Sequence, residues 1–246
     1  MADPFFRKKQ KTLYLVFFSA LVVQVLFSSF IRPLRPLYES VPPVPTLRSA
    51  TIQFLGDREF AYRHIGIMIQ NFGDTGGEHT PLGNYDFEKL TKWFLLENEL
   101  DEKSDYMPFL AAYVFGGSQD VSKLPPVIDY LEYVGNSNEA EKWRWMVQAM
   151  YLARFKMHDN ERGLDLAYKL SALYRPGLPG WVKQMPSFIK LDMGEKEAAY
   201  TFMVEVLKES AEDMHPNEVN FMIDYICNRV LDKQEALKDP LCIESD

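Results

Sequence analysis

The chain has 246 residues, of which 47% are hydrophobic and 25% are charged, so it is neither a disordered nor a low-complexity protein. Two cysteines are too few for a disulfide framework or for a four-cysteine zinc site. The formal net charge of −8 argues against a nucleic-acid binder, because such proteins carry a basic surface. These facts leave a globular protein with one domain or two small ones.

Charge is unevenly distributed along the chain. Residues 1–48 contain seven basic and two acidic side chains, a net of +5, so the remaining 198 residues carry −13. Four of the basic residues stand within residues 1–11, which we expect to form a short cytoplasmic N-terminus: Arg7, Lys8, Lys9 and Lys11. A basic head on an acidic body favours contact between the head and a membrane.

Residues 12–31 form an uncharged, mostly apolar run. As a helix this run is about 30 Å long, which matches the hydrocarbon thickness of a bilayer. It is too long for a signal-peptide core and lacks a small-x-small cleavage site, so we expect a retained single-pass transmembrane helix. Four basic residues precede it, and only Arg32 and Arg35 follow closely. This bias predicts a cytoplasmic N-terminus and a body outside the cytoplasm, on an inner or plasma membrane.

A proline-rich linker follows over residues 32–46, which contain five prolines. Each proline fixes its own φ and restrains the residue before it, so we expect an extended spacer. The linker should join the membrane segment to a helical domain over residues 47–234, followed by a tail over residues 235–246.

The body is predicted to be all-α, because its apolar residues recur at helical spacing and no stretch alternates with period two. Val219, Met222, Ile223, Ile226 and Val230 form one such stripe. Glycine, proline and polar clusters separate the predicted helices, which cover 48–72, 85–101, 105–115, 124–134, 139–157, 161–174, 181–192, 195–210 and 216–232.

One segment of the body recurs along the chain. The residues from His158 to Tyr168 return 36 positions later from Gly194 to Val204, with Ala199 in the place of Gly163. A tight turn followed by a small residue is typical of stacked helix hairpins. This pattern resembles the tetratricopeptide repeat family, whose period is about 34 residues. The resemblance covers residues 158–207 and implies an α-helical hairpin stack, an α-solenoid, that binds other proteins.

The loop from Gly73 to Gly77 reads GDTGG, as around some protease nucleophiles. Serine proteases and aspartic proteases carry motifs of this kind on folds built from β-sheets. Here a helix precedes the loop and no sheet is predicted, which argues against both classes. A second hypothesis is a metal site, since oxygen and imidazole ligands suit zinc or manganese. Its candidate ligands are Asp74, Glu78, His79 and His64.

Two cysteines leave two interpretations open. A bridge between Cys227 and Cys242 would form if the body is translocated across the membrane. Otherwise the first is a small core residue and the second an exposed thiol.

An aromatic and arginine cluster is the candidate protein-interaction site: Trp143, Arg144, Trp145 and Tyr151. Aromatic residues and arginine supply much of the binding energy at protein interfaces. Residues two apart on a helix lie about 200° apart, so we expect Trp143 or Trp145 to lie near the surface.

The sequence therefore predicts a membrane-tethered helical-repeat scaffold or adaptor that binds other proteins. We expect no catalysis, no cofactor, no metal and no nucleic acid, and contact with the membrane through residues 12–31. One alternative is a structural or assembly subunit of a membrane complex. A second is a helical metal-binding enzyme built around the 73–79 loop.

Overall fold

The computed structural model describes residues 4–31, 39–74, 79–137, 139 and 141–243, with the side chains described from residue 11 onward. The chain divides into two compact units, residues 1–39 and residues 40–246.

The first unit contains one long helix, α1 (Pro4–Ile31). Its segment Lys11–Ile31 is long and apolar enough to cross a membrane, and all of its residues are exposed. The segment has 21 residues and measures about 32 Å at the usual helical rise. It coincides with the expected transmembrane segment to within one residue.

The second unit is helical throughout its described residues, with no strand among them. Its α-helices are α2 (Leu47–Gln53), α3 (Arg58–Gln70), α4 (Phe87–Leu100), α5 (Tyr106–Phe109), α6 (Pro125–Gly135), α7 (Trp143–Tyr151), α8 (Asn160–Ala172), α9 (Trp181–Asp192), α10 (Lys196–Ser210), α11 (Pro216–Tyr225), α12 (Lys233–Ala236) and α13 (Pro240–Ile243). Three π-helical segments extend α5, α7 and α11: η2 (Leu110–Val114), η5 (Leu152–Lys156) and η6 (Ile226–Val230). Short 3₁₀ turns are η1 (Leu82–Asn84), η3 (Phe115–Gly117) and η4 (Val121–Lys123). The predicted all-α class is confirmed.

Helices begin where side chains satisfy the free amides of the first turn. Asp57, Asp86 and Asp159 each accept a hydrogen bond from a backbone N–H of the helix that follows. Pro125 and Pro216 occupy first helical positions, where a missing N–H has no cost. These local signals explain why most predicted helix starts fall within two residues of the observed ones.

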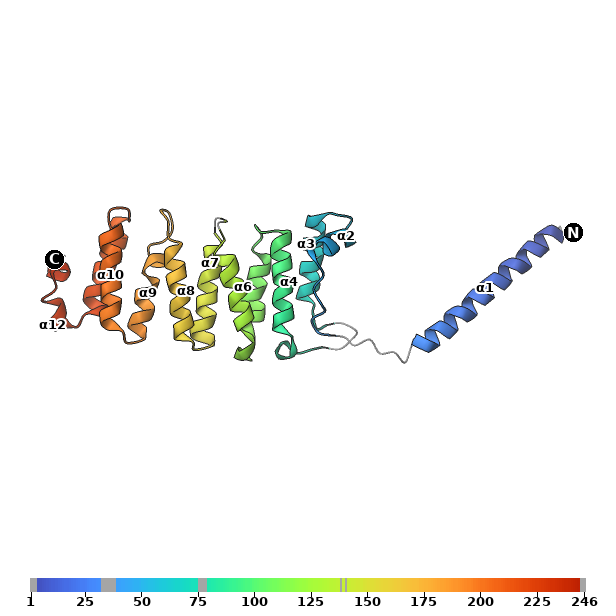
Figure 1. The fold of residues 1–246 in the computed structure, drawn as a ribbon, viewed down its shortest axis with the longest axis horizontal. Helices are drawn as coiled ribbons and strands as arrows, with labels where there is room; N and C mark the ends of the chain where they lie inside the picture. The colour runs from blue at the N-terminus through green and yellow to red at the C-terminus, as the bar shows by residue number, and fades with distance from the viewer. Residues whose placement is uncertain (1–3, 32–38, 75–78, 138, 140, 244–246) are drawn as a thin grey trace. The chain divides into compact units, whose positions relative to one another are not determined.

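Successive helices of the second unit lie side by side in chain order, as Figure 1 shows from α3 to α10. Each packs on the helix before it and the helix after it, most closely in the pairs α6 and α7, α8 and α9, and α9 and α10. Many hydrogen bonds between these layers join residues 37 to 39 positions apart: Lys142 with Asp105, Lys169 with Glu132, Arg154 with Asp192, Gly180 with Glu218, Lys196 with Glu235, and Tyr200 with Asp239. Others span between 30 and 42 positions, as from Arg162 to Glu132 and from Tyr62 to Ser104. An interval of 37 to 39 residues is therefore the one that recurs most often between layers.

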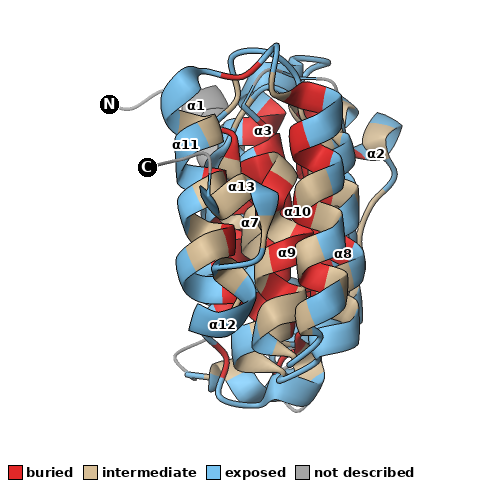
Figure 2. Ribbon diagram, turned by 90° about the vertical axis from the view of Figure 1, so that its left-hand side faces the viewer, coloured by how far each residue is buried: buried red, intermediate tan, exposed pale blue. Residues whose placement is uncertain are grey.

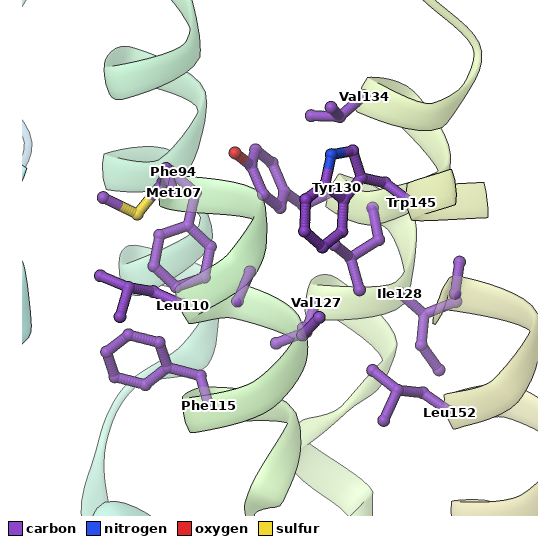
Figure 3. Packing of buried hydrophobic residues seen from close by; sticks show 14 of the residues in the cluster. Phe94, Met107, Leu110, Phe115, Val127, Ile128, Tyr130, Val134, Trp145 and Leu152 are labelled. Atoms are coloured by element: carbon purple, nitrogen blue, oxygen red, sulfur yellow. The ribbon is translucent and has the colours of Figure 1, made fainter. Parts of the chain in front are cut away.

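The core runs between the helices, whose outer faces are exposed (Figure 2). Figure 3 shows its centre, where Phe94 of α4 and Tyr130 of α6 lie with ring centroids 5.2 Å apart. A second, smaller cluster lies around Met203, Met222 and Ile226. The apolar stripe predicted on α11 and η6 contributes to this cluster.

The expected helix over 48–72 is two helices rather than one. α2 ends at Gln53, Leu55 and Gly56 have φ of 59° and 83°, and Asp57 then caps α3. Left-handed residues cannot continue an α-helix. Apolar residues recur at helical spacing on both sides of the break, because α2 and α3 each carry apolar residues on one face. This spacing alone therefore does not show where α2 ends.

The expected linker over residues 32–46 is too long at its C-terminal end. Val41 is only 1% exposed, and the Trp93 indole N–H of α4 donates a hydrogen bond of 2.8 Å to the Pro42 carbonyl. The carbonyl groups of an extended, proline-rich segment make no hydrogen bonds within that segment. The Pro42 carbonyl is therefore free to accept this hydrogen bond. Residues 40–46 therefore belong to the helical unit, while residues 32–38 lie outside the described part.

The expected tail is also part of the helical unit up to Ile243. A disulfide joins Cys227 to Cys242, with Cα atoms 5.7 Å apart. The Tyr200 hydroxyl of α10 donates a hydrogen bond to Asp239, between α12 and α13. Of the two interpretations of the cysteines, the structure contains the bridge.

Candidate functional site

The two tryptophans of the predicted interaction site begin helix α7. Trp143 is 8% exposed and Trp145 is 9% exposed, so the expectation that one of them lies near the surface is wrong. The angle between them is as expected, but α7 packs on α6 on one side and α8 on the other, and it also contacts η2. A helix with neighbours on several sides buries side chains that point in opposite directions.

Trp145 points to α5, where it is held by a polar network. Its indole N–H donates a hydrogen bond of 2.8 Å to the Asp105 carboxylate, which also binds the Lys142 ammonium at 2.9 Å. Burial acts to raise the pKa of Asp105, but the hydrogen bonds from Lys142 and Trp145 outweigh it and lower that pKa. The Lys142 ammonium also donates to the Ser104 carbonyl. Asp105 thus stays ionised and fixes the start of α7 against α5.

Trp143 points the other way, to α9. Its ring centroid lies 5.7 Å from that of Trp181, and its indole N–H has no acceptor among the described residues. A cavity of about 510 Å³ opens beside these rings. Its lining is largely aromatic and comes from α5, η2, α7 and the start of α9: Asp105, Phe109, Tyr113, Glu141, Trp143, Arg144, Trp145, Val147, Gln148 and Trp181. We call this the aromatic cavity.

Arg144 lies at the rim of the aromatic cavity, with a side chain that is 65% exposed. Its guanidinium pairs with Glu141 at 2.5 Å and lies 5.8 Å from the centre of the Trp143 ring. An exposed ion pair of this kind stabilises the fold little. The guanidinium therefore remains available to a ligand at little cost.

Tyr151, the fourth predicted residue, lies outside the aromatic cavity. It is 50% exposed and its ring centroid is 5.2 Å from that of Phe155, one helical turn later. Phe109 and Tyr113 form the same kind of pair at 5.0 Å, and Phe221 and Tyr225 at 6.0 Å. These three pairs lie on α5 with η2, on α7 with η5, and on α11, and α9 between the last two contributes the single ring of Phe188.

The aromatic pairs reveal a pattern that sequence reasoning missed. Tyr113, Tyr151, Phe188 and Tyr225 follow one another at intervals of 38, 37 and 37 residues, close to the interval at which the layers meet. We call these four residues the aromatic ladder. Phe188 and Tyr225 are in ring contact, with centroids 4.8 Å apart. Counting aromatic residues at this interval would have found the ladder in the sequence.

Sequence reasoning also missed Glu97, a fully buried carboxyl on α4. Neither of its oxygens has a hydrogen-bond partner among the described residues. Burial, with a smaller effect of Asp101, raises the pKa of Glu97 to about 8. At neutral pH this side chain is mostly protonated and adds no net charge to the core.

Glu97 stands within a group of tyrosines from α3, α5 and α6. Burial is the main cause that raises the pKa of Tyr62 to about 12 and that of Tyr130 well above its ordinary value, and Glu97 adds to both. The Tyr62 hydroxyl hydrogen-bonds Ser104, while the Tyr130 hydroxyl has no partner among the described residues. These groups join the first hairpins to one another and do not border the aromatic cavity.

The candidate metal ligands are only partly brought together. The His79 ring lies 2.5 Å from the Asp74 carboxylate, and both side chains are largely exposed. His64 instead contacts the Phe54 ring at 5.0 Å, and Glu78 lies outside the described residues. No group of three histidine, cysteine or acidic ligands suited to a metal occurs in the described part of the chain.

A second hollow, of about 450 Å³, is lined by two acidic residues of α6, Asp129 and Glu132, and by Glu102. Arg162 pairs with both carboxylates of α6, and Lys169 pairs with Glu132 at 2.6 Å. These cations come from α8, so the carboxylates serve to hold α6 and α8 together. Their charge is thereby balanced within the fold.

No family model, curated protein or solved structure matches this chain.

Proposed function

We propose that this protein is a single-pass, membrane-tethered scaffold whose helical repeats bind other proteins, without catalysis of its own. The proposal has three parts: the tether, the repeats and the binding face. Each is supported by a separate feature of the chain.

The tether is α1. Its segment Lys11–Ile31 has the length and composition of a transmembrane helix, and its side chains find no cover within the protein. Four basic residues before it favour a cytoplasmic N-terminus and a body outside the cytoplasm. The disulfide between Cys227 and Cys242 supports this orientation, since such bonds persist in oxidising compartments.

The repeats are helix hairpins stacked in the manner of a degenerate tetratricopeptide array. The interval of 37 to 39 residues that recurs between hydrogen-bonded positions supports a repeating unit of that length. Gly163 and Ala199, the small residues of the sequence repeat, are both buried at helix contacts. Gly163 approaches Arg154 on the preceding helix, and the Ser187 hydroxyl of α9 donates to the Ala199 carbonyl at 2.8 Å.

The observation that carries the binding function is the aromatic ladder beside the aromatic cavity. Tyr113 and Tyr151 are 55% and 50% exposed, while Phe188 and Tyr225 are partly buried and pack against the second core cluster. The ladder therefore offers two exposed aromatic rings to a partner. Tyrosine, tryptophan and arginine dominate binding energy at protein interfaces. Tyr113 belongs both to the ladder and to the cavity lining, so the two features form one surface.

The test is site-specific photocrosslinking of the full-length protein in its own cells. A photoreactive amino acid replaces Tyr151 in one variant and Tyr133 in the control. Tyr133 is 58% exposed on α6 and lies outside the ladder. We expect a discrete, larger crosslinked species from position 151 and none from position 133, and the same pattern with position 113.

Equal crosslinking at positions 151 and 133, or none at either, would contradict the proposed binding face. Crosslinks that form mainly within α1 would favour the alternative of a subunit that assembles through its membrane helix. Blue-native migration far above the monomer mass, retained when the ladder is changed to alanine, would support the same alternative.

A further inference from the structure

Helices α2 and α3, with the turn between them, carry four exposed apolar side chains. Ile52 is 61% exposed, Leu55 97%, Phe60 53% and Ile67 60%. Leu55 is the most exposed large hydrophobic residue in the described part of the chain. We call these four residues the α2–α3 patch.

The backbone holds this patch outward. Leu55 has a φ of 59°, a left-handed conformation that a leucine adopts only at a cost in free energy. Gly56 follows with φ of 83°. The Phe54 and Phe60 rings then meet edge to face, with centroids 5.3 Å apart. A strained leucine that contacts almost nothing in its own fold indicates a partner outside it.

The α2–α3 patch follows the apolar helix closely in the sequence. Only residues 32–39 separate the end of the apolar helix from the second unit, which starts at Ser40. Even fully extended, nine residue steps reach about 31 Å. Residues 40–46 then pack on α4, and α2 follows at once. The α2–α3 patch therefore lies in the part of the second unit that is nearest in sequence to the apolar helix.

The distribution of charge along the second unit also favours membrane contact at the α2–α3 patch. Residues 40–70 contain three arginines, Arg48, Arg58 and Arg63, against two acidic residues, Asp57 and Glu59, a net of +1. Residues 71–246 carry −13. An anionic lipid surface therefore repels the acidic residues 71–246 but does not repel residues 40–70. Apolar side chains flanked by arginine are the usual composition of a segment that lies in the membrane interface.

We propose that the α2–α3 patch inserts into the interfacial layer of the lipid bilayer to which α1 tethers the protein. This inference rests on the proposed tether and adds a second membrane contact, which fixes the end of the body that faces the lipid. Ile52, Leu55 and Phe60 enter the acyl boundary, while the arginines remain at the headgroups. The later hairpins, with the aromatic ladder, then stay clear of the membrane for their partner.

The test uses the full-length protein in vesicles of phosphatidylcholine and phosphatidylglycerol that contain a phospholipid with a photoactivatable acyl chain. After irradiation, mass spectrometry locates the lipid adducts. We expect adducts in two regions, residues 12–31 and residues 47–70.

Two variants and one control distinguish lipid contact by the α2–α3 patch from lipid contact by any exposed apolar side chain. Leu55→Gln with Phe60→Gln should lose the adducts in residues 47–70 and keep those in residues 12–31. Leu55→Gly relieves the left-handed strain, so it should reduce the 47–70 adducts while the melting temperature stays equal or rises. Phe109→Gln changes an equally exposed aromatic on α5 and should change neither region.

The outcomes distinguish the two proposals. Adducts in residues 12–31 alone would overturn the interfacial patch and leave the tether intact. Adducts in residues 47–70 alone would support the patch and overturn the tether, and adducts in neither region would overturn both.

Discussion

Gly135, at the end of α6, lies against the backbone of Met146 on α7. A Cβ atom at position 135 would be 2.4 Å from the Met146 amide nitrogen and 2.9 Å from its Cα. Distances this short cannot be relieved by rotating a side chain, because the contact is with backbone. The absence of a side chain at Gly135 is therefore what lets α6 and α7 pack so closely.

Gly135→Ala should consequently force α6 and α7 apart. We expect a loss of about 3 kcal/mol in the free energy of unfolding, the upper part of the usual range for overpacking. Chemical denaturation followed by circular dichroism measures it. Gly117→Ala is the matched control, since nothing lies within 4 Å of the position that its methyl group would take, and it should change stability little. Equal stability of both variants would contradict the close contact.

Glu97→Gln tests the buried carboxyl. Because the pKa of Glu97 is raised to about 8, the folded state holds its proton more tightly than the unfolded chain does. The contribution of Glu97 to stability is therefore greatest below about pH 4.5 and falls as the pH rises to about 8, at up to roughly 1.4 kcal/mol per pH unit. Glutamine cannot ionise, so the variant should be more stable than the native chain at pH 8.5 and similar at pH 4.5.

Denaturant unfolding at several pH values, compared between Glu97→Gln and the native chain, measures this difference. Glu99→Gln on the exposed face of α4 serves as the control. A stability difference that does not change with pH would show that the Glu97 carboxyl is hydrated.

Ala199→Leu tests the packing of α10 on α9. Ala199 is fully buried, and its carbonyl accepts the Ser187 hydroxyl, so the two helices meet at this point. Three added carbon atoms should overpack the contact and destabilise the unit by about 1–3 kcal/mol. Thermal unfolding of the variant is compared with that of Ala198→Leu, whose partly exposed position has room for a larger side chain. Similar melting temperatures for the two variants would place position 199 outside the contact.

The orientation of the chain depends on the basic residues before the apolar helix. Neutralising Arg7, Lys8, Lys9 and Lys11 while keeping Arg32 and Arg35 should weaken or invert insertion. Protease added to cells whose outer barrier alone is open should digest a C-terminal tag in the native chain. Protection of the tag until full lysis would place the body in the cytoplasm.

The disulfide gives an independent measure of the same orientation. In the predicted orientation Cys227 and Cys242 should resist alkylation until a reductant is added. Removing the bond with Cys227→Ser should destabilise the C-terminal hairpin by about 3 kcal/mol, the value for a loop of some fifteen residues. Alkylation of both thiols in unreduced cells would contradict a body outside the cytoplasm.

Local signals in the chain were enough to predict most helices. Asp86, Asp159 and Pro216 cap or begin their helices through contacts within three residues, so their positions follow from the sequence. The prediction failed at Leu55, where the expected single helix breaks, although Gly56 and the Asp57 cap are local signals of that break. It failed again for residues 40–46, because Pro42 is hydrogen-bonded to Trp93, 51 residues later.

The candidate site shows the same division. The sequence identified Trp143 and Trp145 as unusual and predicted the angle between them correctly. Which of them is exposed depended on the helices that pack around α7, and both proved buried. Glu97 went unnoticed because a glutamate on a helix is ordinarily solvated, and its burial depends on α3, α5 and α6, which pack against α4.

The sequence by itself determined the apolar N-terminal helix, the all-α class and the starts of α4, α8 and α11, since each depends on composition or on contacts within a few residues. The tertiary structure alone decided the close contact of Gly135 with Met146, the burial of Glu97 and the outward placement of Leu55. It also decided that Cys227 and Cys242 are near enough to bond. These features arise between residues far apart in sequence, where burial and distance depend on how the helices pack.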